Sequence, residues 1–457
     1  MTDRTQASAT DTTVPPSFWE TLTVYFRPRV LVVLFLGFSA GLPLALSGST
    51  LLYWTAEAGV NLKIIGLFAL VGTPYTLKFL WAPLVDALDV PILGRLLGRR
   101  RGWLLLSQIF LIAAIAFLGL CDPVATPMLV ALGALMVATA SATQDIVIDT
   151  FRVESLAENE QAAGMASYVA AYRVGMLISS AGALYAVSGF EAWGYTKQGA
   201  WSASYMVMAA LVVIGVITVL VAIEPEKSRA VERTRQGVGA LTRLKTTIVG
   251  AFLDFFTREG VVIAVGVLVF VVLFKLTDAL AGVMTGPFTV DLGFTRNEYA
   301  TIIKGVGFAA TLIGGFAGGY VARAWPLATS LWIGGIVQAL ANLAFAWQAV
   351  LGRDLAWLTF AITLENFTSA IGTVIFVAYI SALCRNPLHT ATQYALLTAL
   401  AAVGRTYLSS TGGYIAVGTG WMWFFVICAL AGIPGLLLLA WLQAKGHFKT
   451  LQVKAKS

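Results

Sequence analysis

Long apolar runs separated by short polar connections dominate the 457-residue chain. Most runs are unbroken for about twenty residues, which is the length that an α-helix needs to cross a bilayer. Strands of a membrane barrel would instead give segments of about ten residues with alternating polarity. The pattern predicts about twelve membrane-spanning helices, at 30–56, 63–85, 102–121, 127–150, 164–189, 203–223, 260–286, 298–322, 327–348, 355–383, 391–416 and 421–442.

The longest polar segment divides these spans into two groups of six. We therefore expect an all-α polytopic membrane protein built from two six-helix bundles. Residues 248–256, within the polar segment, have the composition of an amphipathic helix that lies at the membrane interface. The expected parts are a cytoplasmic tail at 1–29, a bundle at 30–223, a linker at 224–259, a second bundle at 260–443 and a tail at 444–457.

Composition supports a membrane protein throughout the chain. Charged residues make up only 12% and hydrophobic residues 58%, with a mean hydropathy of +0.82. A soluble protein carries about 25% charged residues, so a soluble domain with one anchor is excluded. The three cysteines, Cys121, Cys384 and Cys428, match no metal-binding or redox spacing, and we expect no cofactor and no metal.

The distribution of basic residues predicts the orientation. With the N-terminus in the cytoplasm, 21 of the 30 lysines and arginines lie in the tails or in the connections on the cytoplasmic side. Only Lys63, Lys197, Arg296 and Arg353 lie outside. This asymmetry follows the positive-inside rule, places both termini in the cytoplasm and explains the net charge of +7 without nucleic acid. Residues 1–17 are polar and lack a signal-peptide core, so we expect the first span to direct insertion.

The end of the fourth apolar run, at 141–156, carries an unusual set of charges. In a helix, Asp145 and Asp149 share one face, and Arg152 lies one turn further along it. A carboxylate in a low-dielectric cavity can exchange a proton with either side of the membrane, so both acids are candidate proton carriers. The alternative is a static ion pair with Arg152 or Lys78.

Other polar side chains occur inside spans of both halves. A charge at the bilayer centre costs about 2.5–3.5 kcal/mol on insertion scales, so several of them indicate a shared polar cavity. Lys275 and Asp278 are three residues apart and could instead neutralise one another, and Lys78 could reach the interface. The candidate substrate-binding residues are Lys78, Trp81, Gln144, Arg173, Lys275, Asp278, Glu365, Asn366 and Arg405.

A weak internal repeat relates the two halves. Gln161 precedes Arg173 by twelve residues, and Gln393 precedes Arg405 by twelve, in the fifth span of each half. Matching features in two six-helix halves suggest parallel repeats, as in the major facilitator architecture.

A candidate cytoplasmic gate follows the second span. Asp86 ends that span, and Arg99, Arg100 and Arg101 open the third. An acid that faces an arginine cluster can act as a charge latch between conformations. The arrangement resembles the loop motif of major facilitator transporters, although about a dozen residues separate the acid from the arginines. The alternative is simple anchoring of the three arginines at the cytoplasmic interface.

Catalysis finds no support in the sequence. The two histidines, His389 and His447, form no catalytic arrangement, and the chain has no phosphate-binding loop. We therefore expect no enzyme, and an ion gradient rather than ATP as the energy source.

Several motifs in order resemble the AmpG muropeptide permeases of the major facilitator superfamily. They include GFSAGLPLALSGSTL, LKFLWAPLVD, GRRRGWLL, SATQDIVIDTFRVESL, FKLTDAL, LENF and ATQYALLTALAAVGRTY, at 37–51, 77–86, 98–105, 141–156, 274–280, 364–367 and 391–407. The resemblance implies a bacterial inner-membrane importer of N-acetylglucosaminyl-1,6-anhydro-N-acetylmuramyl peptides, driven by protons. It also implies a role in peptidoglycan recycling and, in some bacteria, in β-lactamase induction.

The expected partners are therefore an anhydromuropeptide, protons and the lipid bilayer, with no nucleic acid, and we expect a monomer. One alternative is a related importer of another ligand, such as a siderophore or a coenzyme A thioester. A second alternative is a membrane assembly factor that transports nothing. Charges inside the spans of both halves count against the second alternative.

Overall fold

The computed structural model describes residues 23–157, 160–225, 256–257, 260–384 and 390–453, and every regular element in them is a helix. Most of the expected linker, with its interfacial helix, lies outside these residues. The N-terminal half contains η1 (Val24–Phe26), α2 (Pro28–Ser47), α3 (Ser49–Glu57), α4 (Leu62–Leu67), η2 (Phe68–Gly72), α5 (Thr73–Leu77), η3 (Lys78–Leu80), α6 (Ala82–Ala87), α7 (Leu93–Leu97), α8 (Arg99–Leu120), α9 (Pro127–Ser155), α10 (Gln161–Leu177), η5 (Ile178–Gly182), α11 (Ala183–Ala192) and α12 (Lys197–Val221).

The C-terminal half follows the same plan of long helices joined by short turns. It contains α15 (Val261–Phe274), α16 (Leu276–Asp291), α17 (Arg296–Tyr299), η6 (Ala300–Val306), α18 (Gly307–Ala324), α19 (Leu327–Leu351), α20 (Leu355–Leu383), α21 (Thr390–Val403), η7 (Gly404–Leu408), η8 (Ser409–Thr411), α22 (Gly412–Leu430), α23 (Ile433–Ala444) and α24 (His447–Val453).

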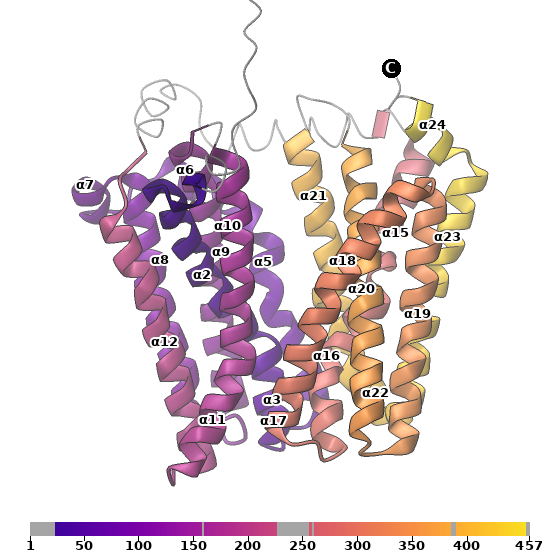
Figure 1. Ribbon diagram of the computed structural model, residues 1–457, viewed down its shortest axis with the longest axis horizontal. Coiled ribbons are helices and arrows are strands. Elements are labelled where there is room, and N and C mark those ends of the chain that lie inside the picture. The colour runs from indigo at the N-terminus through magenta and orange to yellow at the C-terminus, as the bar shows by residue number, and fades with distance from the viewer. Residues whose placement is uncertain (1–22, 158–159, 226–255, 258–259, 385–389, 454–457) are drawn as a thin grey trace, which may run out of the picture.

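Eleven helices in the described part of the chain are long and apolar enough to cross a membrane. The last of them, Leu396–Ala444, has 49 residues and covers the expected span 421–442 and most of the expected span 391–416. Gly420 interrupts it with a non-helical φ of 76°, and α21 and α24 lie at the same end of the molecule in Figure 1. The chain therefore turns back at Gly420, and the expected all-α polytopic fold is confirmed.

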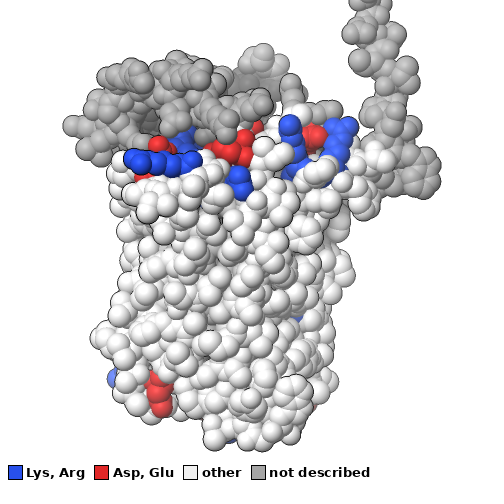
Figure 2. All heavy atoms as spheres, turned by 90° about the vertical axis from the view of Figure 1, so that its left-hand side faces the viewer, with Lys and Arg blue, Asp and Glu red and all other residues white. Residues whose placement is uncertain are grey.

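Two helical bundles stand side by side (Figure 1). Helices α2 to α12 form one bundle and α15 to α24 the other. On the face shown in Figure 2, charged side chains gather at one end, above a broad uncharged belt. We call this end, which carries Arg27, Arg29 and Arg99 to Arg101, the basic end. The belt is what a bilayer would cover.

Glycines bring helix backbones into direct contact in both bundles. A Cβ on Gly41 would overlap the backbone carbonyl oxygen of Tyr172, which fixes α2 against α10. A Cβ on Gly314 would likewise overlap the carbonyl oxygen of Phe367 and separate α18 from α20. Small residues permit such close packing between membrane helices.

We expect Gly314→Ala to lower the thermal unfolding temperature, because the new methyl group pushes α18 away from α20. The neighbouring Gly315→Ala is a matched control, since nothing lies within 4 Å of its Cβ position. Alanine there should be neutral or stabilise the helix by up to about 1 kcal/mol. Thermal melts in detergent measure both, and equal melting temperatures for the two variants would contradict this packing.

Candidate functional site

One cluster of charges lies where η3 approaches α9. Asp145 is 9% exposed, and the positive charge of Lys78 interacts with both Asp145 and Asp149. The side chain of Asp149 is 54% exposed and lies 3.8 Å from the guanidinium of Arg152. Because that distance is at the limit of an ion pair and one partner is exposed, the static pair of Asp149 with Arg152 is weak. The structure thus brings Lys78 to the two candidate acids.

Polar atoms beside Asp145 are buried without protein partners. Both amide atoms of Gln144 and one carboxylate oxygen of Asp145 have no hydrogen-bond partner among the described residues. Buried polar atoms in proteins are almost always paired with protein or water. This part of α9 is therefore suited to hold water, a proton or a polar ligand. Nearby, the indole nitrogen of Trp81 donates a hydrogen bond to the hydroxyl of Thr143 at 3.2 Å.

Arg173 and Arg405 come from different halves and approach one aromatic side chain. Arg173 lies in α10 and Arg405 in η7, and both are exposed although each lies within a membrane-spanning helix. The charges of both arginines interact with the hydroxyl of Tyr172. The hydroxyls of Thr76 and Thr406 lie 3.2 Å apart, so η7, which carries Arg405, lies at the interface between the halves.

Lys275 and Asp278 form a close ion pair at the junction of α15 and α16. The Lys275 Nζ lies 2.6 Å from the Asp278 carboxylate and donates a second hydrogen bond to Thr373 at 2.9 Å. Ser369 donates to the same carboxylate oxygen at 2.6 Å. The mutual neutralisation foreseen as an alternative is therefore present, and it ties α16 to α20.

Glu365 and Asn366, on α20, lie next to the ion pair of Lys275 with Asp278 and extend this polar cluster along the helix. The Asn366 amide donates to Glu365 at 2.8 Å, and the hydroxyl of Thr311 donates to Asn366 at 3.2 Å. The charges of Asp278, Lys275 and Lys304 all interact with Glu365. Lys304 also donates to the hydroxyl of Ser49, in the other half, at 3.0 Å. From the sequence, Lys304 could equally reach the outer membrane interface, because it follows Glu298 by only six residues near the expected helix end.

Three spans at the interface contain π-helical segments: η5, η6 and η7. Lys304 lies in η6 and Arg405 in η7. Such bulges are rare in helices and frequently occur at functional sites. Hydrophobic periodicity gives no sign of them. Among the described residues, no three His, Cys, Asp or Glu side chains come together as metal ligands would.

Two of the three arginines of the expected gate, Arg100 and Arg101, hold helices of the N-terminal half together. Arg100 pairs with Glu154 at 2.9 Å, and the backbone N–H groups of Arg100 and Arg101 donate to Glu224. Arg101 also donates to two carbonyl oxygens at the end of α12. Arg99 is buried at the start of α8. The side chain of Asp86 lies outside the described part of the structure, so its expected role stays a prediction.

An ion cluster joins the halves at the end opposite the basic end. We call it the Arg296 latch, and it consists of Arg296 from the C-terminal half with Glu57 and Glu191 from the N-terminal half. The Arg296 guanidinium lies 2.7 Å from each carboxylate and is 8% exposed. Trp201 donates to Glu57 at 2.9 Å and lies beneath the guanidinium, at 5.6 Å from ring centroid to Cζ. No local sequence pattern predicts this cluster, because Glu57 and Glu191 are 239 and 105 positions from Arg296.

The chain matches a family model and several curated proteins. Residues 33–407 match the Major Facilitator Superfamily model. The "Anhydromuropeptide permease" of Escherichia coli (strain K12) is 37% identical over 92% of this chain and 80% of the relative. The "Putative transporter AmpG 4" of Rickettsia conorii is 34% identical over 91% of this chain and 97% of the relative.

Solved structures share the fold at low sequence identity. A D-xylose-proton symporter is 13% identical with a TM-score of 0.63, over 91% of this chain and 97% of that chain. A POT family transporter in complex with 5-aminolevulinic acid is 12% identical with a TM-score of 0.66, over 91% of this chain and 96% of that chain. These likenesses show the fold alone. Together with the two relatives and the family model, they lead to one conclusion: the chain is an AmpG-like permease of the Major Facilitator Superfamily, a multi-pass membrane transporter and not an enzyme.

Proposed function

We propose that this protein imports anhydromuropeptides across the bacterial inner membrane in symport with protons, as a monomer with both termini in the cytoplasm. The observation that carries the proposal is the pair of exposed intramembrane arginines, Arg173 and Arg405, one from each half, beside Tyr172. The name of the Escherichia coli relative supplies the substrate class.

The charges suit a ligand with sugar rings and several carboxylates. Arginine binds a carboxylate with two parallel hydrogen bonds, which fixes both position and orientation. Because Arg173 and Arg405 belong to different bundles, one peptide carboxylate held between them would couple ligand binding to the approach of the halves. The exposed face of Tyr172 and the indole of Trp81 are suited to pack against a sugar ring.

Asp145 is the preferred proton carrier, with Asp149 as its exposed neighbour. A buried carboxylate with one lysine partner changes charge when a proton arrives, and this change alters its attraction to Lys78. The charges of the candidate site nearly cancel. They are the carboxyl groups of Asp145, Asp149, Asp278 and Glu365 and the cations of Lys78, Arg173, Lys275, Lys304 and Arg405. A proton or an anionic substrate therefore shifts that balance at the interface.

Transport requires the two halves to separate at one end while they close at the other. The positive-inside rule assigns the basic end to the cytoplasm, so the Arg296 latch lies at the periplasmic end. Other contacts between the halves reinforce that end: Tyr185 with Thr301 at 2.5 Å, and Ser188 with Asn297 at 2.9 Å. This conformation is closed toward the periplasm, as expected for release of substrate to the cytoplasm.

We expect Arg296→Gln to open the periplasmic end. The substitution leaves two carboxylates without their cation, and loss of one partner from a buried ion pair destabilises a structure by about 3–5 kcal/mol. A cysteine introduced at Ser188 reports the change through its reaction rate with a membrane-impermeant thiol reagent. The three native cysteines are buried. We expect the reaction rate to rise at least about tenfold, which corresponds to a shift of about 1.4 kcal/mol or more in the free-energy difference between the closed and open conformations.

Arg353→Gln is the matched control for this measurement. Arg353 pairs with Glu298 at 2.8 Å at the same end, but both residues belong to the C-terminal half and Arg353 is half exposed. We expect no change in cysteine reactivity. Equal rates for Arg296→Gln and Arg353→Gln would contradict the role of the Arg296 latch.

Proteoliposome uptake tests the proposed function. Labelled anhydromuropeptide should accumulate only when the imposed proton gradient is directed inward, and unlabelled anhydromuropeptide should compete. Competition by a siderophore or a coenzyme A thioester, together with no uptake of the muropeptide, would reassign the substrate. Absence of uptake for every ligand, with the protein correctly inserted, would count against any transport role.

A further inference from the structure

A groove on the outer surface of the N-terminal bundle lies apart from the candidate site. It has a volume of about 810 Å³ and runs between α2 and α12, with the C-terminal end of α9 at one end of it. Pockets of about 300–1,000 Å³ are typical of sites for small organic ligands. None of the intramembrane charges discussed above lines it.

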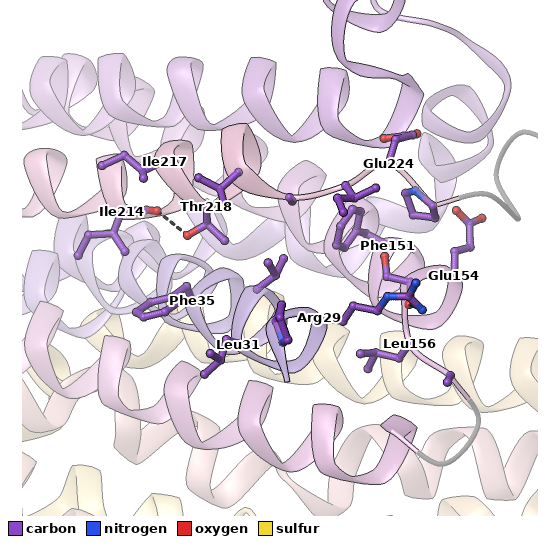
Figure 3. Close-up of a pocket in the computed structure, with 18 residues that line it drawn as sticks. Arg29, Leu31, Phe35, Phe151, Glu154, Leu156, Ile214, Ile217, Thr218 and Glu224 are labelled. Carbon is purple, nitrogen blue, oxygen red and sulfur yellow. Dashed lines mark hydrogen bonds between the residues drawn. The ribbon is translucent and has the colours of Figure 1, made fainter. Parts of the chain in front are cut away.

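The groove has one polar end and one apolar end. Arg29, Glu154 and Glu224 gather at the end where the helices reach the membrane surface (Figure 3). Phe35, Ile214 and Ile217 lie at the other end, toward the middle of the membrane. Phe35 and Ile217 are 45% and 57% exposed, so this apolar end is open toward the bilayer. A groove with one polar and one apolar end suits an amphiphile whose head group lies at the membrane–water interface.

The length of the groove matches one leaflet. From Ile214 to Val221, where α12 ends, the helix rises about 10 Å at 1.5 Å per residue, and Ala222 to Glu224 continue the lining beyond the helix. The hydrocarbon core of a bilayer is about 30 Å thick, so one leaflet contributes about half of that. A lipid tail that enters at the interface would therefore lie along the groove over most of its length.

At the polar end, the two glutamates that line the groove are already engaged, whereas Arg29 is exposed. Glu154 is paired with Arg100, and Glu224 accepts hydrogen bonds from the start of α8. Glu160, outside the spans, is paired with Arg27 at 2.8 Å, and this hydrogen bond lowers the pKa of Glu160. Within the described part of the structure, Arg29 donates one long hydrogen bond of 3.4 Å, to the carbonyl oxygen of Ser155, and its charge also acts on Glu160 without forming a close ion pair.

The geometry points to a binding site for one anionic phospholipid, with its phosphate on Arg29 and an acyl chain between α2 and α12. A guanidinium group suits a phosphate because its N–H groups can form two parallel hydrogen bonds. Among the described residues, the five arginines of the basic end outnumber Glu154, Glu160 and Glu224, so these side chains together favour an anion. Anionic lipids of the cytoplasmic leaflet supply this head group.

Native mass spectrometry of the full-length delipidated protein tests the head group. The probes are phosphatidylglycerol and phosphatidylcholine with identical acyl chains. We expect one phosphatidylglycerol to be retained with about fivefold preference, as attraction of about 1 kcal/mol for one basic residue implies. Arg29→Gln should reduce the preference to less than twofold. Arg323→Gln, at an exposed arginine near the same surface in the other bundle, should keep it. Equal preference in Arg29→Gln and the unmodified protein would overturn the assignment.

A photo-cross-link tests what fills the apolar end. A benzophenone amino acid replaces Ile217, which is exposed enough to accept it, and the protein is irradiated in native membranes. A product heavier by one phospholipid supports the proposal. A cross-link to residues 1–22 or 226–255 of the same chain would overturn it, because the groove would then hold the protein's own segment. Neither measurement depends on transport activity.

Discussion

Asp145→Asn abolishes uptake that is driven by a proton gradient and reduces accumulation to the level seen without a gradient. A carboxamide keeps the size and hydrogen-bonding groups of the side chain, but it can neither bind nor release a proton at Asp145. The substitution also leaves Lys78 with only the half-exposed Asp149 as an acidic partner on α9. We expect Asp149→Asn to have a smaller effect, since water already solvates much of that carboxylate.

Two assays on the same vesicles separate coupling from binding. Net accumulation under an inward proton gradient should be lost in Asp145→Asn, whereas exchange of labelled for unlabelled substrate should continue, because exchange moves no net proton. Asp89→Asn supplies the matched control, since Asp89 is exposed near the membrane surface. Unchanged pH dependence in both Asp145→Asn and Asp149→Asn would place the proton site elsewhere.

The second large effect is expected at the arginine pair. Arg173→Gln and Arg405→Gln should each lower uptake about 10- to 100-fold, because a hydrogen bond to a charged group contributes about 1.5–3 kcal/mol. Lysine keeps the charge but loses the two-pronged geometry, so Arg173→Lys and Arg405→Lys should give intermediate uptake. Arg323→Gln should transport normally.

A double variant shows whether the arginines act on one ligand group. If Arg173 and Arg405 hold the same carboxylate, the loss in the double variant will be smaller than the product of the single losses. Uptake and cell-surface amounts of each variant are measured together, so that insertion and transport are separated. Normal uptake by both glutamine variants would remove the arginines from the substrate site.

The membrane spans were predictable from the sequence because long apolar runs carry a strong signal of their own. The ion pair of Lys275 with Asp278 was also predictable, since three residues along a helix fix that approach. The grouping of Lys78 with the α9 carboxylates was predictable only as a possibility, because it depends on packing between separate spans.

Features made by distant segments gave no sequence signal. Neither the distance of Arg296 from its two glutamates nor the contact of Gly314 with the Phe367 backbone follows from any local pattern. The expected gate shows a related limit. The arginine cluster was recognised, but its partners Glu154 and Glu224 depend on where α9 and α12 end, and helix ends are the least certain part of a sequence-based prediction.

In the proposed orientation, the Arg296 latch also sets the apparent affinity of the transporter for a ligand that arrives from the periplasm. Ligand from the periplasm binds only molecules whose outer end is open. If the latch stabilises the closed end by about 3 kcal/mol, roughly 1% or fewer of the molecules are open at any moment, and the Kd measured from that side is about a hundredfold weaker than the Kd of the open site. In the proposed orientation, the cluster that closes the periplasmic end would thus also set the apparent Kd for ligand in the periplasm.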